Sequence, residues 1–374
     1  MTTSVAHSLP YRRDIDGLRG IAVLLVVFYH VGVRTIGGGY AGVDVFFVIS
    51  GYLITQVILK GVGEGTFTLR GFYLRRARRI LPALTVMVAF CVVAALVLYP
   101  PTELRIFGAT LAYVAGFAGN IWFALHQYVG YFQSSENPSI LLHTWSLSVE
   151  EQFYILYPLL VAALARKGRK LLLVLLLVLF AASLAACQWW TKAHPVGAFY
   201  LLPPRAWELL AGGLLGAGAL PPLRWRAARE VAMTAGLGVI LVAAIKLTAF
   251  TPFPGDAALV PVLGAALVLW AGDGASVGAS VLRSQPLAGV GLISYSLYLW
   301  HWPIIVLTRY IPCTRSGAWF TLPEKAEMLA TSIVLAIVSY RYVEQPSIAL
   351  GRKTIGWLHG RQHAWRVRLD VLKP

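Results

Sequence analysis

Long apolar runs dominate this sequence and constrain its fold more than any other feature. The ~30 Å hydrocarbon core of a bilayer requires about 20 apolar residues per helix, and about ten or eleven runs approach that length. The candidate spans are residues 20–33, 43–59, 83–99, 106–125, 153–164, 171–190, 207–219, 231–249, 257–271, 292–307 and 329–342. Barrel strands would be about ten residues long with strict alternation. The runs therefore predict an all-α, polytopic bundle of about ten (ten or eleven) transmembrane helices.

The composition agrees with a chain whose main solvent is lipid. Hydrophobic residues make up 58% of the chain and charged residues 13%, with a mean hydropathy of +0.69, whereas soluble domains carry about 25% charged residues. The net charge of +16 resembles that of nucleic-acid-binding proteins. In membrane proteins, however, Lys and Arg collect in cytoplasmic loops and meet anionic lipid. We therefore expect membrane lipid, and no nucleic acid, as a partner.

The cysteines do not indicate a metal site, and the two ends of the chain indicate an anchor and a short tail. Cys91, Cys187 and Cys313 stand singly, without metal-binding spacing, so no metal is expected. The first apolar run follows basic residues as a signal peptide would, but no small-residue cleavage site follows it, which indicates a retained anchor. We expect a membrane domain over residues 1–346 and a short basic cytoplasmic tail over residues 347–374.

Basic clusters set the expected orientation. Arg12 and Arg13 precede the first span, and the third is preceded by Arg70, Arg75, Arg76, Arg78 and Arg79, so both places should be cytoplasmic. The cluster at residues 166–170 lies on the same side only if an even number of crossings separates it from Arg79, but three candidate spans lie between them. Either one of these spans does not cross, or residues 140–148 form a further crossing or re-entrant segment. The best estimate is ten crossings, with both termini cytoplasmic.

Ionisable residues inside apolar runs are expensive and indicate function by default. Arg19 and His30 would lie about 16 Å apart along one helix, with His30 nearer the outer face. Asp44 enters the second span at a similar depth, so a His30–Asp44 pair could act as a general base with a fixed tautomer. The alternative is an interfacial histidine and a helix-capping aspartate.

An arginine cluster precedes the third span. Arg75 and Arg79 stand four residues apart and Arg76 and Arg79 three apart, so a helix would place them on neighbouring faces. Guanidinium groups bind phosphate oxygens in bidentate fashion, which would suit a polyphosphate donor such as a coenzyme A thioester. The alternative is an ordinary cytoplasmic basic cluster.

Three further segments carry polar side chains beside apolar runs. Residues 143–154 hold His143, Glu150 and Glu151, which need mutual partners or a water-filled cavity; only one of the two glutamates is expected to face His143. Arg205 and Glu208, three residues apart, could neutralise each other. Residues 294–303 surround a histidine with aromatic side chains, which either form an interfacial belt or line a sugar or pantetheine channel.

Together these segments resemble the acyltransferase 3 family of membrane acyltransferases. The matching elements run in order over nearly the whole chain: residues 11–30 with the R-x10-H element Arg19–His30, 42–55, the RRxxR element at Arg75, Arg76 and Arg79, 142–154, 204–208, 291–303 and 339–346. Each element alone is weak, but the ordered set is specific.

The resemblance implies a helix bundle in the bacterial inner membrane that uses an acyl-CoA, commonly acetyl-CoA, from the cytosol. It implies an acceptor hydroxyl on lipopolysaccharide, exopolysaccharide or peptidoglycan, or on a secondary metabolite. Catalysis is expected from His30, oriented by Asp44 or Glu150, and donor binding from Arg19, Arg75, Arg76 and Arg79. Substrate binding is expected from Ser50, His143, Trp145, Tyr298, Trp300 and His301. Some relatives carry a carboxy-terminal esterase-like domain, which is not expected here.

Two other functions are compatible with these residues. A transporter or flippase for a lipid-linked glycan would line its path with the same polar residues, although no internal repeat is visible. A non-catalytic membrane partner would not need both Arg19 and His30.

Overall fold

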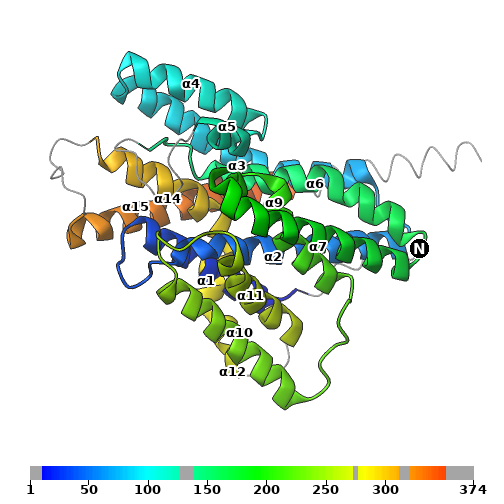
Figure 1. Cartoon of the computed structure of the whole chain (residues 1–374). Coiled ribbons are helices and arrows are strands. Elements are labelled where there is room, and N and C mark those ends of the chain that lie inside the picture. Colours follow the sequence, from blue (N-terminus) through cyan, green and yellow to red (C-terminus); the bar gives the residue numbers. More distant parts are fainter. Residues whose placement is uncertain (1–10, 127–137, 273–276, 311–319, 351–374) are drawn as a thin grey trace, which may run out of the picture.

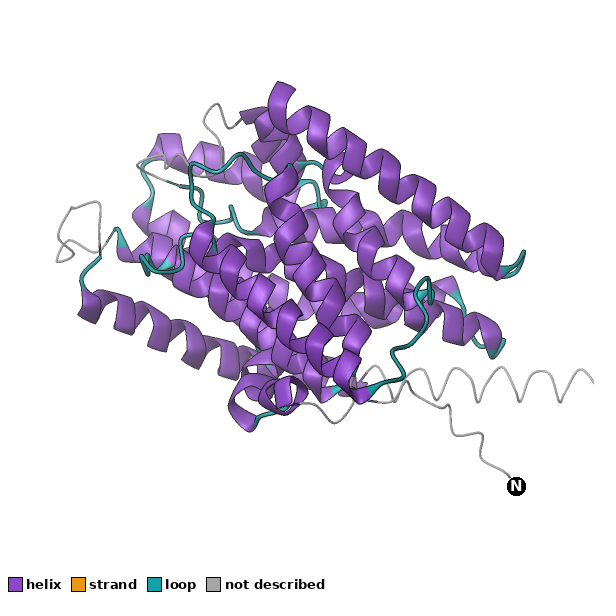
Figure 2. Ribbon diagram, turned by 60° about the horizontal axis from the view of Figure 1, so that its bottom comes forward, coloured by secondary structure: helices purple, strands orange, loops and turns teal. Residues whose placement is uncertain are grey.

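Helices are the only regular secondary structure in the residues that the structure describes, 11–126, 138–272, 277–310 and 320–350 (Figure 2). The structure is a computed structural model. Helices satisfy every backbone polar group within one segment, as a lipid environment demands. They are α1 (Arg13–His30), α2 (Gly42–Gly63), α3 (Leu69–Leu98), α4 (Pro101–Ala115), α5 (Gly119–His126), α6 (Thr144–Ala165), α7 (Arg169–Ala193), α8 (Pro195–Tyr200), α9 (Leu202–Gly216), α10 (Arg226–Lys246), α11 (Leu259–Ala271), α12 (Val277–Leu282), α13 (Gln285–Leu292), α14 (Ser294–Thr308) and α15 (Leu322–Ser339). The predicted all-α membrane bundle is confirmed.

The number of long spans is smaller than expected. Six helices of the described residues are long and apolar enough to cross a membrane, or seven if the bent pair α13 and α14 counts as one span. Of the predicted spans, 207–219 and 257–271 became the short helices α9 and α11. The first span, α1, has only 18 residues and begins with charged side chains. The estimate of ten simple crossings therefore exceeds the count of long apolar helices.

The predicted span 106–125 is not one helix. It is divided into α4 and α5, which lie together at the edge of the bundle (Figure 1). The break contains Gly116 and Phe117, whose φ of 52° ends the helical path. Among the described residues from Arg79 to Arg166, α3 and α6 are the helices long and apolar enough to cross a membrane. This count favours the first of the two alternatives that the basic clusters leave open.

Helix α2 packs at the centre of the bundle against α1, α6 and α9. It approaches α9 so closely that a Cβ on Gly51 would lie 1.8 Å from the carbonyl oxygen of Leu209, and a Cβ on Gly212 would lie 1.9 Å from that of Val48. Only glycine fits at both positions, because a methyl group would push the backbones apart. This close contact brings polar side chains of α2 and α9 together in the core.

The carboxy-terminal half of the described chain closes the bundle. Helices α13 and α14 meet at 71°, which sets Tyr298 and His301 of α14 against α1. Helix α15 is followed without a break by a π-helical turn, Tyr340–Glu344, and the helical path runs on to Leu350, so the expected tail boundary at residue 346 falls inside a helix. Residues 351–374, most of that tail, lie outside the described residues, as does Cys313.

Candidate active site

A cavity of about 260 Å³ lies between α1, α2, α3, α6 and α14. Its lining includes hydrophobic side chains of α2, such as Val43 and Phe46, and a group of polar residues at one part of the wall. Seven residues predicted for the site line it: Arg19, Ser50, Arg75, Arg76, Arg79, Glu150 and Tyr298. Five helices that are separate in the sequence thus meet at one cavity.

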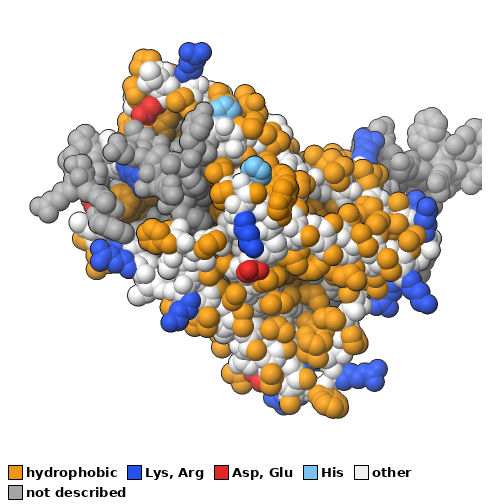
Figure 3. All heavy atoms as spheres, viewed as in Figure 1, with side chains coloured by type: hydrophobic (Ala, Val, Ile, Leu, Met, Phe, Trp, Pro, Cys, Tyr) orange, Lys and Arg blue, Asp and Glu red, His pale blue; other side chains and the backbone are white. Residues whose placement is uncertain are grey.

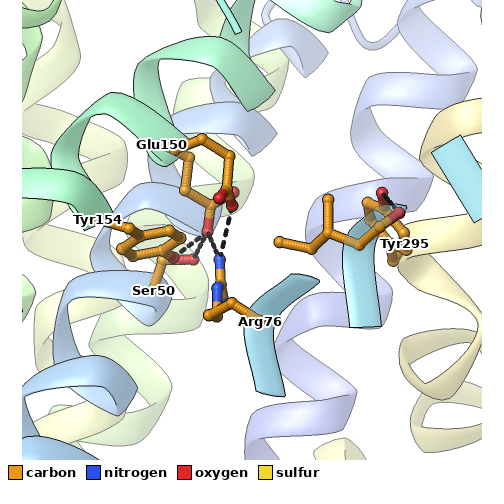
Figure 4. A network of polar contacts seen from close by, with 7 residues as sticks. Ser50, Arg76, Glu150, Tyr154 and Tyr295 are labelled. Carbon is orange, nitrogen blue, oxygen red and sulfur yellow. Dashed lines mark hydrogen bonds and ion pairs between the residues drawn. The ribbon is translucent and has the colours of Figure 1, made fainter. Parts of the chain in front are cut away.

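One face of α6 supplies the acidic wall of this cavity. Ser146, Glu150 and Tyr154 are spaced four residues apart and all line it. The carboxylate of Glu150 accepts hydrogen bonds from Ser50 (2.5 Å) and from Tyr154, and lies 3.6 Å from Arg76. Figure 4 shows these three groups converging on Glu150, with Tyr295 across from them. Through these contacts, Glu150 links α6 to both α2 and α3.

The arginines of the cavity divide into two kinds. Arg76 lies 3.6 Å from Glu150 and 3.3 Å from Glu151, and its guanidinium stacks 3.8 Å from the centre of the Tyr154 ring. Arg75 and Arg79 line the cavity and form no hydrogen bond or ion pair with another described residue, although Arg79 lies near enough to Glu344 to attract it electrostatically. Both expose positive charge to the cavity, where an anionic ligand could bind it. Neither glutamate contacts His143, contrary to expectation, because both side chains reach toward Arg76.

Three histidines form a second cluster next to the cavity. Nδ1 of His30 lies 2.9 Å from Nε2 of His301, with the two rings stacked, and the His143 ring is centred 5.8 Å from that of His301. His143 and His301 are buried, and neither ring nitrogen of His143 hydrogen-bonds to a described residue. The predicted residues His30, His143 and His301, far apart in sequence, are brought together.

Hydrogen bonding fixes the tautomers of two of these rings when they are neutral. Nδ1 of His301 lies 2.7 Å from the carbonyl oxygen of Tyr298; a carbonyl only accepts, so this nitrogen carries the proton. Nε2 of His301 is then an acceptor, and Nδ1–H of His30 donates to it. The lone pair of His30 consequently lies on Nε2, the nitrogen that can take a proton from a substrate.

Tyr298 stands between the cavity and the histidines. Its ring lines the cavity, its hydroxyl donates to the carbonyl oxygen of His143 (2.9 Å) and lies 2.6 Å from the hydroxyl of Ser146. Its own carbonyl holds His301. A ligand that passes from the cavity to His30 must therefore displace or pass the Tyr298 side chain.

Asp44 does not pair with His30. It is fully buried and lies 3.2 Å from Arg205 of α9, which in turn lies 3.1 Å from Glu208. The predicted neutralisation of Arg205 by Glu208 is thus confirmed, with Asp44 as a second acid. Asp44 and His30 match in expected depth, but Asp44 lies on the side of α2 that packs against α9.

The two predicted tryptophans lie outside the cavity lining. Trp145 packs against Phe47 and Phe199 and lies 5.6 Å from the guanidinium of Arg205. Trp300 packs against Phe90 of α3. Among the described residues, no group of three or more His, Cys, Asp and Glu side chains is placed to hold a metal.

Tyr154, Ser146 and Tyr295 belong to the site but were not singled out from the sequence as site residues. The spacing of four that joins Ser146, Glu150 and Tyr154 places them on one helix face and could have identified the first two. Tyr295 lines the cavity and donates to the carbonyl oxygen of Ile80 (2.8 Å). Tyr295 and Ile80 are far apart in the sequence, so no spacing pattern predicts their contact.

Comparisons with known proteins agree on one family. A family model described as an acyltransferase domain matches residues 12–340. The chain is 33% identical over 365 residues to the peptidoglycan O-acetyltransferase OatA of Listeria monocytogenes, covering 92% of this chain and 57% of the relative. It is 31% identical over 371 residues to the O-acetyltransferase OatA of Staphylococcus aureus, covering 94% and 60%.

A third relative is matched over most of its length. BcsY of Komagataeibacter xylinus, whose name suggests a membrane-bound transacylase, is 35% identical over 339 residues, covering 90% of this chain and 83% of the relative. The chain thus spans less than two thirds of the two O-acetyltransferases described above. No solved structure gives a significant match.

Proposed function

Because this chain belongs to the acyltransferase family, we propose that it is a multi-pass membrane O-acyltransferase that moves an acetyl group from acetyl-CoA to a glycan hydroxyl. The observation that carries the proposal is that a candidate phosphate-binding cavity and a candidate general base lie on either side of Tyr298. An arginine-lined cavity lies on one side of this residue and a histidine with a fixed tautomer on the other. Phosphate binding and general base catalysis are what such a transfer requires.

The donor would enter from the arginine end of the cavity. Arg75 and Arg79 suit the phosphates of coenzyme A, with Arg19 nearby, whereas Arg76 is held by its two glutamates. Pockets for complete ligands usually measure about 300–1,000 Å³. A cavity of about 260 Å³ suits the narrow acylated pantetheine arm, with the nucleotide outside it.

His30 would act as the general base. Nε2 of His30 takes the proton of the acceptor hydroxyl while the hydroxyl oxygen attacks the thioester carbonyl carbon. The new C–O bond forms, the C–S bond breaks, and the leaving thiolate takes the proton back from His30. The hydrogen bond from Nδ1–H of His30 to His301 (2.9 Å) strengthens while His30 is cationic. Asp44 would act indirectly, by holding α2 to α9 through Arg205.

The relatives support a class of acceptor. Two of them are O-acetyltransferases, one named for peptidoglycan, so we propose a cell-wall or exported glycan as the acceptor. The bacterial inner membrane is the proposed location. The count of two long apolar helices, α3 and α6, from Arg79 to Arg166 supports the proposal that both basic clusters lie on the cytoplasmic side.

Glycan acetylation in cells tests this function. The chain, His30→Ala and the control His194→Ala, which changes an exposed histidine, are expressed in a host whose peptidoglycan lacks O-acetyl groups. We expect O-acetyl signals in the NMR spectrum of the glycan with the wild type and the control only. Acetylation by membrane-inserted His30→Ala would refute the assignment of the base.

A further inference from the structure

A second, largely apolar groove lies on the outer surface of the bundle, between α6, α7 and α9. We call it the lateral groove; its volume is about 610 Å³. Leu156 and Leu159 on its wall are 65% and 46% exposed. Its lining includes Phe153, Leu156 and Leu160 of α6, Leu179 and Ala182 of α7, and Leu210 of α9.

The lining offers no hydrogen bond to an occupant from its two polar side chains. The hydroxyl of Tyr157 bonds to Thr55, at 2.6 Å, and that of Ser183 donates to the carbonyl oxygen of Pro203, at 2.5 Å. A sugar or a pantetheine arm would leave its polar groups unsatisfied there. Because α6 and α7 are among the helices that can cross a membrane, a hydrocarbon chain of the bilayer matches this lining.

A basic turn marks one end of the same two helices. Arg166, Lys167 and Lys170 are exposed where α6 passes into α7, and Arg169 donates to the carbonyl oxygen of Gly218 (2.6 Å). Figure 3 shows Lys and Arg side chains at the end of the hydrophobic surface that α6, α7 and α9 present. Positive charge at the end of two membrane-spanning helices attracts the anionic headgroups of lipids.

The distances suit one lipid molecule. At 1.5 Å per residue, Leu160 lies about 9 Å along α6 from Arg166, and Leu179 lies about 15 Å along α7 from Arg169. The hydrocarbon of one leaflet is about 15 Å thick, half of the ~30 Å core. A chain whose headgroup rests on the basic turn therefore passes over the lateral groove.

We propose that the lateral groove and the basic turn together form a binding site for one anionic phospholipid, with an acyl chain in the groove and its phosphate on the turn. The site is separate from the catalytic cavity, with which it shares no lining residue. It does not depend on the proposed transferase activity.

Native mass spectrometry of the purified chain tests the site, with dioleoyl phosphatidylglycerol and dioleoyl phosphatidylcholine as probes. Ala182→Trp fills the groove, and Ala181→Trp is the matched control, since both positions are exposed neighbours on α7 and only Ala182 lines the groove. Ala182→Trp should weaken phosphatidylglycerol binding more than about tenfold, and Ala181→Trp should leave it unchanged. A double variant, Arg166→Gln with Lys167→Gln, should lower the preference for phosphatidylglycerol roughly thirtyfold, at about 1 kcal/mol per charge.

Three results would overturn the proposal. The first is equal lipid retention by the two tryptophan variants, and the second is equal binding of both phospholipids by the wild type. The third is a dimer that Ala182→Trp dissociates without loss of lipid, because the groove would then hold a second copy of the chain. Thermal unfolding of each variant shows whether the fold is intact.

Discussion

His301 offers a sharp test of the histidine arrangement, because it touches the proposed base without lining the donor cavity. Its Nε2 accepts the 2.9 Å hydrogen bond from His30, and its Nδ1 is fixed by the Tyr298 carbonyl. When His30 takes a proton, this bond becomes charge-assisted, and hydrogen bonds to charged groups contribute about 1.5–3 kcal/mol. His301→Ala should therefore lower kcat by roughly 10- to 150-fold.

The Michaelis constant separates this role from a packing role. Since His301 is absent from the cavity lining, the KM for acetyl-CoA should stay within about twofold of the wild type. His301→Gln places an acceptor oxygen near the position of Nε2 and should recover part of kcat. Steady-state acetyl transfer by the purified variants, with His194→Ala as control, gives both constants. A wild-type kcat in His301→Ala, or a raised KM at unchanged kcat, would refute the tautomer argument.

Three further predictions concern the donor site and the core. Arg79→Ala should raise the KM for acetyl-CoA roughly 10- to 150-fold, through loss of a charge-assisted phosphate contact, with kcat nearly unchanged; a fall in kcat at constant KM would contradict the assignment. Arg205→Met should destabilise the protein by about 3–5 kcal/mol in thermal unfolding, because two buried carboxylates lose their shared cation, whereas exposed Arg224→Met should not. Gly51→Ala should lower the unfolding temperature by overpacking α2 against α9, at a cost of at least about 1–3 kcal/mol, whereas Gly238→Ala, with open space around it, should be tolerated; equal unfolding temperatures would contradict the close contact.

The sequence predicts the helical bundle well because apolar length is a strong signal. The span at 171–190 lies inside α7, and the span at 83–99 ends one residue beyond α3. The break at Gly116 and Phe117 was missed since both residues continue an apolar run, and a turn that interrupts such a run does not alter its hydropathy. Hydropathy therefore finds membrane-depth segments more reliably than it finds helix ends.

The sequence predicts which site residues share one helix face, but it does not predict which helices contact one another. Arg75, Arg76 and Arg79 line one cavity, as their spacing on one helix indicated. The erroneous His30–Asp44 pair came from comparing depths, which leaves the facing direction of α2 undetermined. The contact of His30 with His301 joins α1 to α14. A local sequence pattern does not predict a contact between residues so distant in the sequence.

Transfer of label from radiolabelled acetyl-CoA tests the central claim most directly. The purified chain in liposomes is supplied with labelled acetyl-CoA and a peptidoglycan fragment, and the glycan is analysed for covalent label. The wild type should place alkali-labile label on the glycan, and His30→Ala should place none while it binds acetyl-CoA with unchanged affinity. Labelled glycan formed by His30→Ala, or label that crosses the membrane without reaching the glycan, would contradict the account.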